Sequence, residues 1–239
     1  MGETEEGANP ANGADHAPSA PADAPADVTV DVTDRATAAR SAARSPARTK
    51  HDLRRRIRAE RRGRTPQEQA DDARALVASV QAVPEVAAAR CVALYASMPG
   101  EPQTEELRAA LRARGVRVIL PIVLPDGLME WADDSGELVA PAGFGGDEPT
   151  GPRLGLDGIR AADVVLVPAL AVDTLGRRLG QGAGYYDRAL PLLDDGVPVV
   201  AVVHDGEVLD AAVEPVPDEP HDRRVDAVVT PKGYLRLGG

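Results

Sequence analysis

The sequence predicts a single α/β domain in three layers, with helices covering a mainly parallel sheet, preceded by a disordered N-terminal tail. Short Val-rich segments alternate with segments of helical periodicity between about residue 50 and residue 203, as in α/β folds. The 239 residues, 43% of them hydrophobic, are enough for one sizeable core. Residues 1–46 contain no Leu, Ile, Phe, Tyr or Trp and cannot bury enough apolar surface to offset the entropy of ordering. We therefore divide the chain into a tail, 1–46, and a folded domain, 47–239.

The elements of the domain are expected in an alternating order that favours parallel strands with helical crossovers. We expect helices at 50–62 and 66–82, a strand at 90–96, a helix at 104–114, a strand at 116–122, a hairpin-like region around 127–140, a strand at 163–168, a short helix at about 185–193 and a strand at 198–203. The strand at 163–168 is short, Val-rich and ends at a proline. Because ligands bind at the carboxyl ends of parallel strands, the loops after Ala96 and Val167 are expected to meet in one cleft.

Composition narrows the classes of partner. The net charge of −11 argues against bulk attraction to nucleic acid or to an anionic membrane, so we expect a small-molecule partner. Cys91 is the only cysteine, which excludes an intrachain disulfide. The start of the chain does not have the pattern of a secretory signal, and no apolar run approaches the roughly 20 residues of a membrane span. We expect a monomeric protein in the cytoplasm.

The run DTLGRRLGQGAGYYDR, residues 173–188, is the strongest candidate for a ligand site. Gly180, Gly182 and Gly184 stand at alternate positions, where positive φ would let successive amides converge on phosphate oxygens. The run matches neither the Walker A pattern nor the dinucleotide fingerprint, and a structural turn remains an alternative. The flanking Arg178, paired tyrosines and Asp187 favour ligand binding, and a carboxylate beside phosphate suggests Mg²⁺.

A basic helix at the start of the domain is the second candidate. Lys50 and Lys232 are the only lysines among 27 basic residues, and Lys50 opens KHDLRRRIRAERR. Lys50, Arg54, Ile57 and Arg61 are spaced to share one helix face. This face could clamp a polyphosphate or carboxylate, or be an ordinary solvated surface. Contact with nucleic acid is a weaker third reading, because no aromatic residues are interleaved.

Several segments together resemble the 5-formyltetrahydrofolate cyclo-ligase family over most of residues 50–230. The resemblance rests on KHDLR (50–54), YASMPGEPQT (95–104), DEP (147–149), RLGQGAGYYDR (178–188) and DRRVD (222–226). The glycine and tyrosine block is specific, and the order of the others along one chain makes coincidence improbable. The tail has no counterpart in the family pattern.

The resemblance implies an enzyme that uses ATP and Mg²⁺ to convert 5-formyltetrahydrofolate into 5,10-methenyltetrahydrofolate, with release of ADP and phosphate. Phosphorylation of the formyl oxygen would make it a good leaving group for attack by N10. Positioning and charge neutralisation would supply most of the catalysis, so that no enzyme nucleophile is needed.

Site residues follow from motif position within this resemblance. For ATP it implies Lys50, His51, Asp52, Leu53, Arg54, Arg178, Leu179, Gly180, Gln181, Gly182, Ala183, Gly184, Tyr185 and Tyr186. For the reduced folate it implies Arg54, Ala96, Glu101, Gln181, Gly182, Ala183, Gly184 and Tyr185. Lys50, Arg178 and Tyr186 are the implied catalytic residues, and Asp187 and Asp222 the implied Mg²⁺ side.

Gln181 and Ala183 depart from the usual pattern of the family. They leave open a paralogue that binds nucleotide or folate without turnover. A sugar-phosphate isomerase or transferase on a similar sheet is a further alternative, because fold alone does not fix chemistry. Trp131 could flank the pterin ring or fill the core, and we favour the core.

Overall fold

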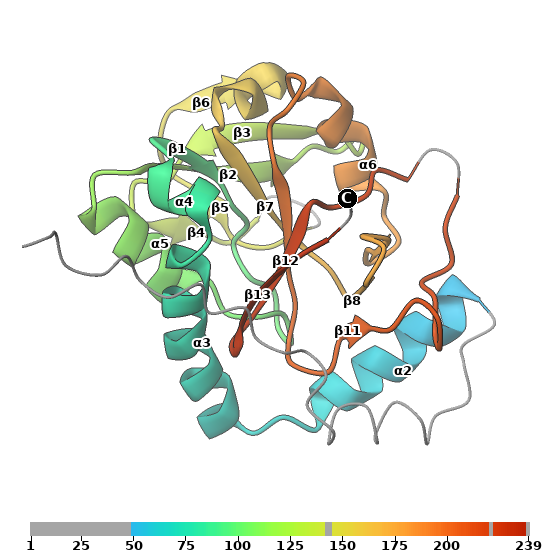
Figure 1. The fold of residues 1–239 in the computed structure, drawn as a ribbon. Coiled ribbons are helices and arrows are strands. Elements are labelled where there is room, and N and C mark those ends of the chain that lie inside the picture. Colours follow the sequence, from blue (N-terminus) through green and yellow to red (C-terminus); the bar gives the residue numbers. More distant parts are fainter. Residues whose placement is uncertain (1–48, 142–144, 220–221, 238–239) are drawn as a thin grey trace, which may run out of the picture.

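A computed structural model describes residues 49–141, 145–219 and 222–237. The predicted tail, 1–46, lies outside the described residues. In the described part, an eight-stranded sheet with the order β13-β12-β10-β7-β1-β2-β3-β6 forms the centre (Figure 1). This architecture confirms the predicted helix-covered α/β fold.

The middle of the sheet is parallel. β1 (Cys91–Ala93) lies between β2 (Arg117–Val123) and β7 (Val164–Pro168), and β7 is followed by β10 (Val199–Val202) and β12 (Ala227–Thr230). The residues of β7 and β10 are almost all buried, as expected for parallel strands covered on both faces. The outer strands are antiparallel to their neighbours: β13 (Gly233–Arg236) at one edge, and β3 (Met129–Asp133) followed by the edge strand β6 (Arg153–Gly155) at the other.

Helices cover one face of the sheet. α3 (Pro66–Gln81), α4 (Pro84–Ala88) and α5 (Glu105–Ala113) pack there over a core of Leu and Val side chains, which includes Leu76, Leu107 and Leu166. α3 begins at a capping box, in which Thr65 and Glu68 satisfy each other's backbone N–H groups, and at Pro66.

Short helical elements cover the opposite face. These are η1 (Leu156–Ala161), α6 (Tyr185–Ala189) and η2 (Leu190–Leu192), which pack over a second core. Trp131 is fully buried in this core, as predicted. The α-helix predicted at 185–193 is shorter in the structure and ends at Ala189. Pro191 lies in the 3₁₀ turn that follows, where it cannot continue the α-helix.

The prediction of a hairpin within 127–140 was wrong, because the two strands in this range do not pair with each other. β3 pairs with the preceding β2, whereas β4 (Leu138–Val139) pairs with β5 (Glu148–Pro149). Residues 117–133 thus form the hairpin, closed by a turn in which the Leu124 and Leu128 backbones are hydrogen-bonded. The sequence did not indicate this because β2 is buried on both faces and its periodicity does not reveal a neighbour.

A third, smaller core joins α2 (Lys50–Arg62) to a three-stranded sheet. That sheet has the order β11-β8-β9, with β8 (Ala171–Asp173), β9 (Arg178–Leu179) and β11 (Val208–Leu209). Leu53 and Ile57 of α2 pack against Leu170 and Leu179. This packing sets α2 beside the carboxyl ends of β1 and β7, where the candidate site lies (Figure 1). In the described part of the chain, no helix is long and apolar enough to cross a membrane.

Candidate functional site

A cavity of about 910 Å³ lies where the parallel strands end. The loop after β1 contributes Ala96 and Glu101, and the end of β7 contributes Pro168 and the following Leu170. The two loops therefore meet in one cleft, as the strand order predicted. The volume is at the upper end of the roughly 300–1,000 Å³ typical of ligand pockets.

One wall of the cavity is cationic and comes from α2. Lys50, Arg54, Arg58 and Arg61 line it, at spacings of about one helical turn. Ile57, predicted on this face, instead packs in the third core and is 2% exposed. Arg58 was not among the predicted site residues, although its four-residue spacing from Arg54 could have indicated it.

Lys50 is held in place by two carboxylates. Its Nζ donates to Asp222 Oδ2 at 2.7 Å and to Glu219 Oε1 at 2.8 Å. Burial lowers the pKa of Lys50, but the hydrogen bonds to Asp222 and Glu219 outweigh it, so the pKa is raised overall. The ammonium group is therefore charged at neutral pH and fixed at the cavity edge.

The glycine loop forms the floor beside α2. Gly182 and Gly184 have φ of +106° and +71°, which favour glycine, whereas Gly180 does not have positive φ, contrary to the prediction for all three. Arg54 Nε donates to the Gly180 carbonyl at 2.9 Å. The loop and α2 are thereby joined directly across 126 positions of sequence.

Arg178 and Tyr186 extend this floor. The Arg178 side chain is 6% exposed, its Nη2 donates to Asp187 Oδ1 at 2.6 Å, and its guanidinium lies 5.9 Å from the centre of the Tyr186 ring. Arg178 Nε and the Tyr186 hydroxyl are buried and have no hydrogen-bond partner among the described residues. Burial, with a smaller contribution from Glu101, raises the pKa of Tyr186, so its phenol stays protonated at neutral pH and can donate a hydrogen bond. Buried polar atoms without partners beside a cavity point to a polar ligand there.

Glu101 supplies a carboxylate from the opposite side. The residue is 4% exposed, and its Oε2 accepts from the Met98 N–H at 3.1 Å. Its Oε1 accepts from Gln181 Nε2, also at 3.1 Å. Arg58 Nη2 in turn donates to Gln181 Oε1 at 3.0 Å, so Gln181 joins the carboxylate to the cationic wall.

An apolar patch adjoins Glu101 and was missed by the sequence analysis. Met98, Pro121, Val123 and Met129 line the cavity, as does Tyr95. These residues belong to β2, β3 and the loop after β1, and nothing in their local pattern distinguishes them from core residues. The patch gives the cavity a surface suited to a flat, apolar ligand group.

Three residues implied by motif position do not line the cavity. His51 is exposed, and Leu53 is buried in the third core. At the start of α2, the Asp52 carboxylate accepts from the Thr49 hydroxyl, and the Asp52 backbone N–H donates to the same hydroxyl oxygen. All the other predicted site residues are cavity-lining, including both implied metal carboxylates, Asp187 and Asp222. Over the described ranges, no cluster of three or more His, Cys, Asp or Glu side chains could hold a metal ion alone.

Comparison with known sequences identifies the family. The sequence profile described as the 5-formyltetrahydrofolate cyclo-ligase family matches residues 46–231. The chain belongs to this family. The match confirms the resemblance predicted from the motifs and begins where the predicted tail ends.

Individual relatives agree with this assignment. A 5-formyltetrahydrofolate cyclo-ligase of Mycolicibacterium smegmatis is 44% identical over 149 residues, which are 60% of this chain and 74% of the relative. The protein of that name from Escherichia coli K12 is 32% identical over 180 residues, which are 73% of this chain and 96% of the relative. The solved structure of 5,10-methenyltetrahydrofolate synthetase from Aquifex aeolicus has a TM-score of 0.66 and 28% identity, covering 80% of this chain and 93% of that one.

Proposed function

We propose that this member of the cyclo-ligase family uses ATP to convert 5-formyltetrahydrofolate into 5,10-methenyltetrahydrofolate, with release of ADP and phosphate. The observation that carries the proposal is one cavity with a cationic side and an opposite wall of different chemistry. Lys50, Arg54 and Arg178 lie on the cationic side, and the Glu101 carboxylate lies on the opposite wall with the methionines. Such a cavity suits two ligands of different chemistry that must meet.

The proposed reaction has two steps. The formyl oxygen attacks the γ-phosphorus of ATP as the bond to ADP breaks. N10 then attacks the formyl carbon, the phosphate leaves with the former formyl oxygen, and N10 gives up its proton. Both steps need alignment and neutralisation of charge more than a covalent nucleophile. Cys91 does not serve as one, since it is buried in β1, and burial raises the pKa of its thiol to about 11.

The cationic residues are proposed to bind the phosphates of ATP. Lys50 offers a point charge, and Arg178 offers a nearly buried guanidinium whose Nε has no partner among described residues. The Tyr186 hydroxyl, buried and protonated, is suited to donate to an oxygen of the transferred phosphate. The backbone of the loop at Gly182 and Gly184 is free of side-chain bulk and can approach the phosphates closely.

The Glu101 carboxylate is proposed to bind the pterin ring. Adjacent N–H groups of a pterin edge can donate as a pair to one carboxylate. Met98 and Met129 beside it offer polarizable contact surface for the flat ring system. Gln181 lies between the two proposed subsites and contacts both walls, at Glu101 and at Arg58.

Asp187 and Asp222 are the residues that would hold Mg²⁺. Each lines the cavity, and each is paired with a cation that the proposal assigns to ATP, Arg178 and Lys50 respectively. Mg²⁺ is commonly bound through one or two carboxylates together with substrate phosphates and water, so these residues fit the ion. When bound, the ion would neutralise charge that develops on the phosphates.

The test mixes purified protein with 5-formyltetrahydrofolate, ATP and Mg²⁺ and follows the near-ultraviolet absorbance of the methenyl product. Parallel reactions omit ATP, or contain EDTA in place of Mg²⁺. We expect product only when all components are present, with one ADP per methenyl group. Binding of both ligands without product would instead identify a non-catalytic paralogue, and turnover that ignores ATP would contradict the proposal.

A further inference from the structure

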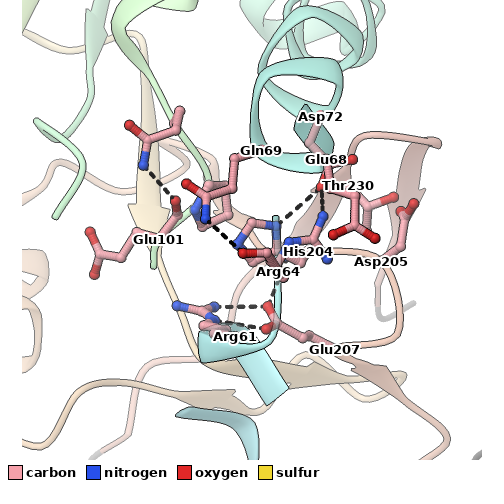
Figure 2. Close-up of polar contacts among 12 residues, drawn as sticks. Arg61, Arg64, Glu68, Gln69, Asp72, Glu101, His204, Asp205, Glu207 and Thr230 are labelled. Carbon is pink, nitrogen blue, oxygen red and sulfur yellow. Dashed lines mark hydrogen bonds and ion pairs between the residues drawn. The ribbon is translucent and has the colours of Figure 1, made fainter. Parts of the chain in front are cut away.

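A buried polar cluster lies behind the Glu101 wall of the cavity. It consists of Arg61, Arg64, Asp72, His204 and Glu207 (Figure 2). Arg61, His204 and Glu207 are between 3% and 6% exposed. Burial of so many polar groups is costly unless they are mutually satisfied, so their arrangement calls for a role.

Glu207 fixes the centre of this cluster. Its carboxylate accepts from Arg61 Nε at 2.7 Å and Arg61 Nη2 at 2.8 Å, a bidentate pair. The same carboxylate accepts from the backbone N–H of His204 at 2.8 Å. His204 lies two residues after the end of β10, so its position is set by the sheet and by a buried ion pair together.

Arg61 lines the cavity itself, and the cluster also reaches two of the cavity walls through backbone carbonyls. Arg61 Nη2 donates to the Ala169 carbonyl at 2.6 Å, between the cavity-lining Pro168 and Leu170. His204 Nε2 lies 3.2 Å from the Gly100 carbonyl, next to Glu101. Because a carbonyl can only accept, this contact places the ring proton on Nε2. Nδ1 lies 3.4 Å from Asp72 Oδ2, a long contact, and Arg64 holds that carboxylate.

The segment that His204 contacts is a tight turn. The Glu101 N–H donates to the Met98 carbonyl at 3.0 Å, and Pro99 and Gly100 are the central residues, with φ of +85° at Gly100. This is the pattern of a type II turn. Within the turn, this backbone bond and the bond from the Met98 N–H to Glu101 Oε2 hold the two ends, and Gly100 itself is conformationally permissive. The contact from His204 holds the Gly100 carbonyl, which belongs to the peptide group that leads into Glu101.

We propose that His204 is a positioning residue for Glu101: its Nε2–H holds the Gly100 carbonyl and thereby fixes the turn that carries the carboxylate into the cavity. His204 does not line the cavity and acts through Gly100 alone. The inference rests on the proposed function in one respect, namely that Glu101 binds the reduced folate.

The test compares His204→Leu with His204→Gln. Leucine fills the buried site without a donor, whereas the glutamine amide can take the place of Nε2–H. For the leucine variant we expect the dissociation constant of 5-formyltetrahydrofolate, measured calorimetrically without ATP, to rise about five- to tenfold, as for loss of one hydrogen bond to a positioned group. The KM for ATP should stay within about twofold. The glutamine variant should recover most of the affinity.

A double-mutant cycle with Glu101→Gln separates positioning from general destabilisation. If His204 acts through Glu101, His204→Leu should change the dissociation constant little once the carboxylate has been replaced. Val228→Ala, a buried change in β12, is the control for lost stability and should leave folate affinity unchanged. Should the leucine variant fail to fold, His204→Asn replaces it, because its shorter side chain cannot reach Gly100.

The possible outcomes distinguish the two proposals. A wild-type dissociation constant in the leucine or asparagine variant would overturn the positioning role while leaving the cyclo-ligase reaction intact. An equal loss of affinity in the Glu101→Gln background would also overturn it. Failure of the wild-type protein to bind the folate at all would instead contradict the proposed function, and the positioning role with it.

Discussion

Arg178 combines near-complete burial with a polar atom that lacks a partner in the described structure. One guanidinium nitrogen of Arg178, Nη2, donates to Asp187, which fixes the orientation of the guanidinium group and leaves its Nε–H without a partner among the described residues. A planar, permanently charged fork of this kind recognises phosphate oxygens in pairs, which lysine cannot do.

Replacement of Arg178 by alanine should therefore impair ATP use selectively. Charge-assisted hydrogen bonds contribute about 1.5–3 kcal/mol, so we expect the KM for ATP to rise roughly 10- to 100-fold. The dissociation constant of the reduced folate alone should stay within about threefold. Arg160→Ala removes an exposed surface ion pair with Asp194 and is the matched control. Equal effects of Arg178→Ala on both ligands would contradict the division of the cavity into two subsites.

The protonation state of His204 leads to a second prediction about a single residue. Burial first, then the charges of Arg64 and Arg61, lower the pKa of His204 to about 4. In the unfolded chain the pKa is about 6.5, so between pH 6.5 and pH 4 the unfolded state binds a proton that the folded state does not. The free energy of unfolding should consequently fall as the pH falls through this window, by roughly 3 kcal/mol at pH 4.

Urea denaturation of the wild-type protein and His204→Gln between pH 7 and pH 4 measures this effect. The other charged groups around His204, namely Asp72, Arg64, Arg61, Asp205 and Glu207, are common to both proteins. The difference between the two curves therefore isolates His204. A difference that does not change with pH would show that the ring is not held in its neutral form.

At the scale of elements, the start of α3 shows how far local sequence determines structure. Thr65 and Glu68 form a complete capping box, and Pro66 between them begins the helix at the predicted residue. The start of α2 at Lys50 is set in the same way by the Thr49 side chain. These boundaries follow from contacts within three residues.

Thr65→Ala should lower the free energy of unfolding by about 1 kcal/mol, the usual contribution of an N-cap hydroxyl. Chemical denaturation measures the change, and Thr65→Ser should keep most of the stability because it keeps the hydroxyl. The kinetic constants should not change, since Thr65 does not line the cavity. An unchanged midpoint in the alanine variant would mean that packing of α3 on the sheet alone specifies its start.

Pairing between elements was less predictable than the elements themselves. The strand expected at 116–122 is present as β2, but the hairpin expected within 127–140 does not form, because β3 pairs with β2 and the two-residue β4 pairs with β5. Similarly, Ile57 was placed on the cationic face of α2, although it lies close to the boundary between that face and the core. The spacing of residues along a helix shows which of them share a face, but it does not show which residues at the margin of that face are buried against the rest of the protein.

At the scale of the whole molecule, an acidic chain surrounds a cationic cavity. The net charge is −11, yet α2 and the glycine loop bring Lys50, Arg54 and Arg178 to one site. Their charge is partly balanced by Asp187, Glu219 and Asp222 at the cavity edge. Composition alone excluded bulk attraction to polyanions, but it carried no information on this local arrangement.

Removal of residues 1–46 should leave both stability and activity unchanged. These residues lie outside the described part of the chain, and their composition offers little apolar surface for a core. The family match begins at residue 46. Urea denaturation and kcat/KM of a chain comprising residues 47–239, compared with the full chain, provide the test. A more than threefold loss of kcat/KM would assign a function to the tail.

The sequence by itself determined the α/β class, most element boundaries, the glycine loop and the family motifs. All of these depend on local spacing and on residue chemistry, which the chain carries regardless of its fold. Only the tertiary structure decided that Arg58 and the methionines line the cavity, that His51 and Leu53 do not, and that His204 and Glu207 lie behind Glu101. These relations join residues more than 100 positions apart, and they are set by how the sheet and α2 pack, which no local pattern encodes.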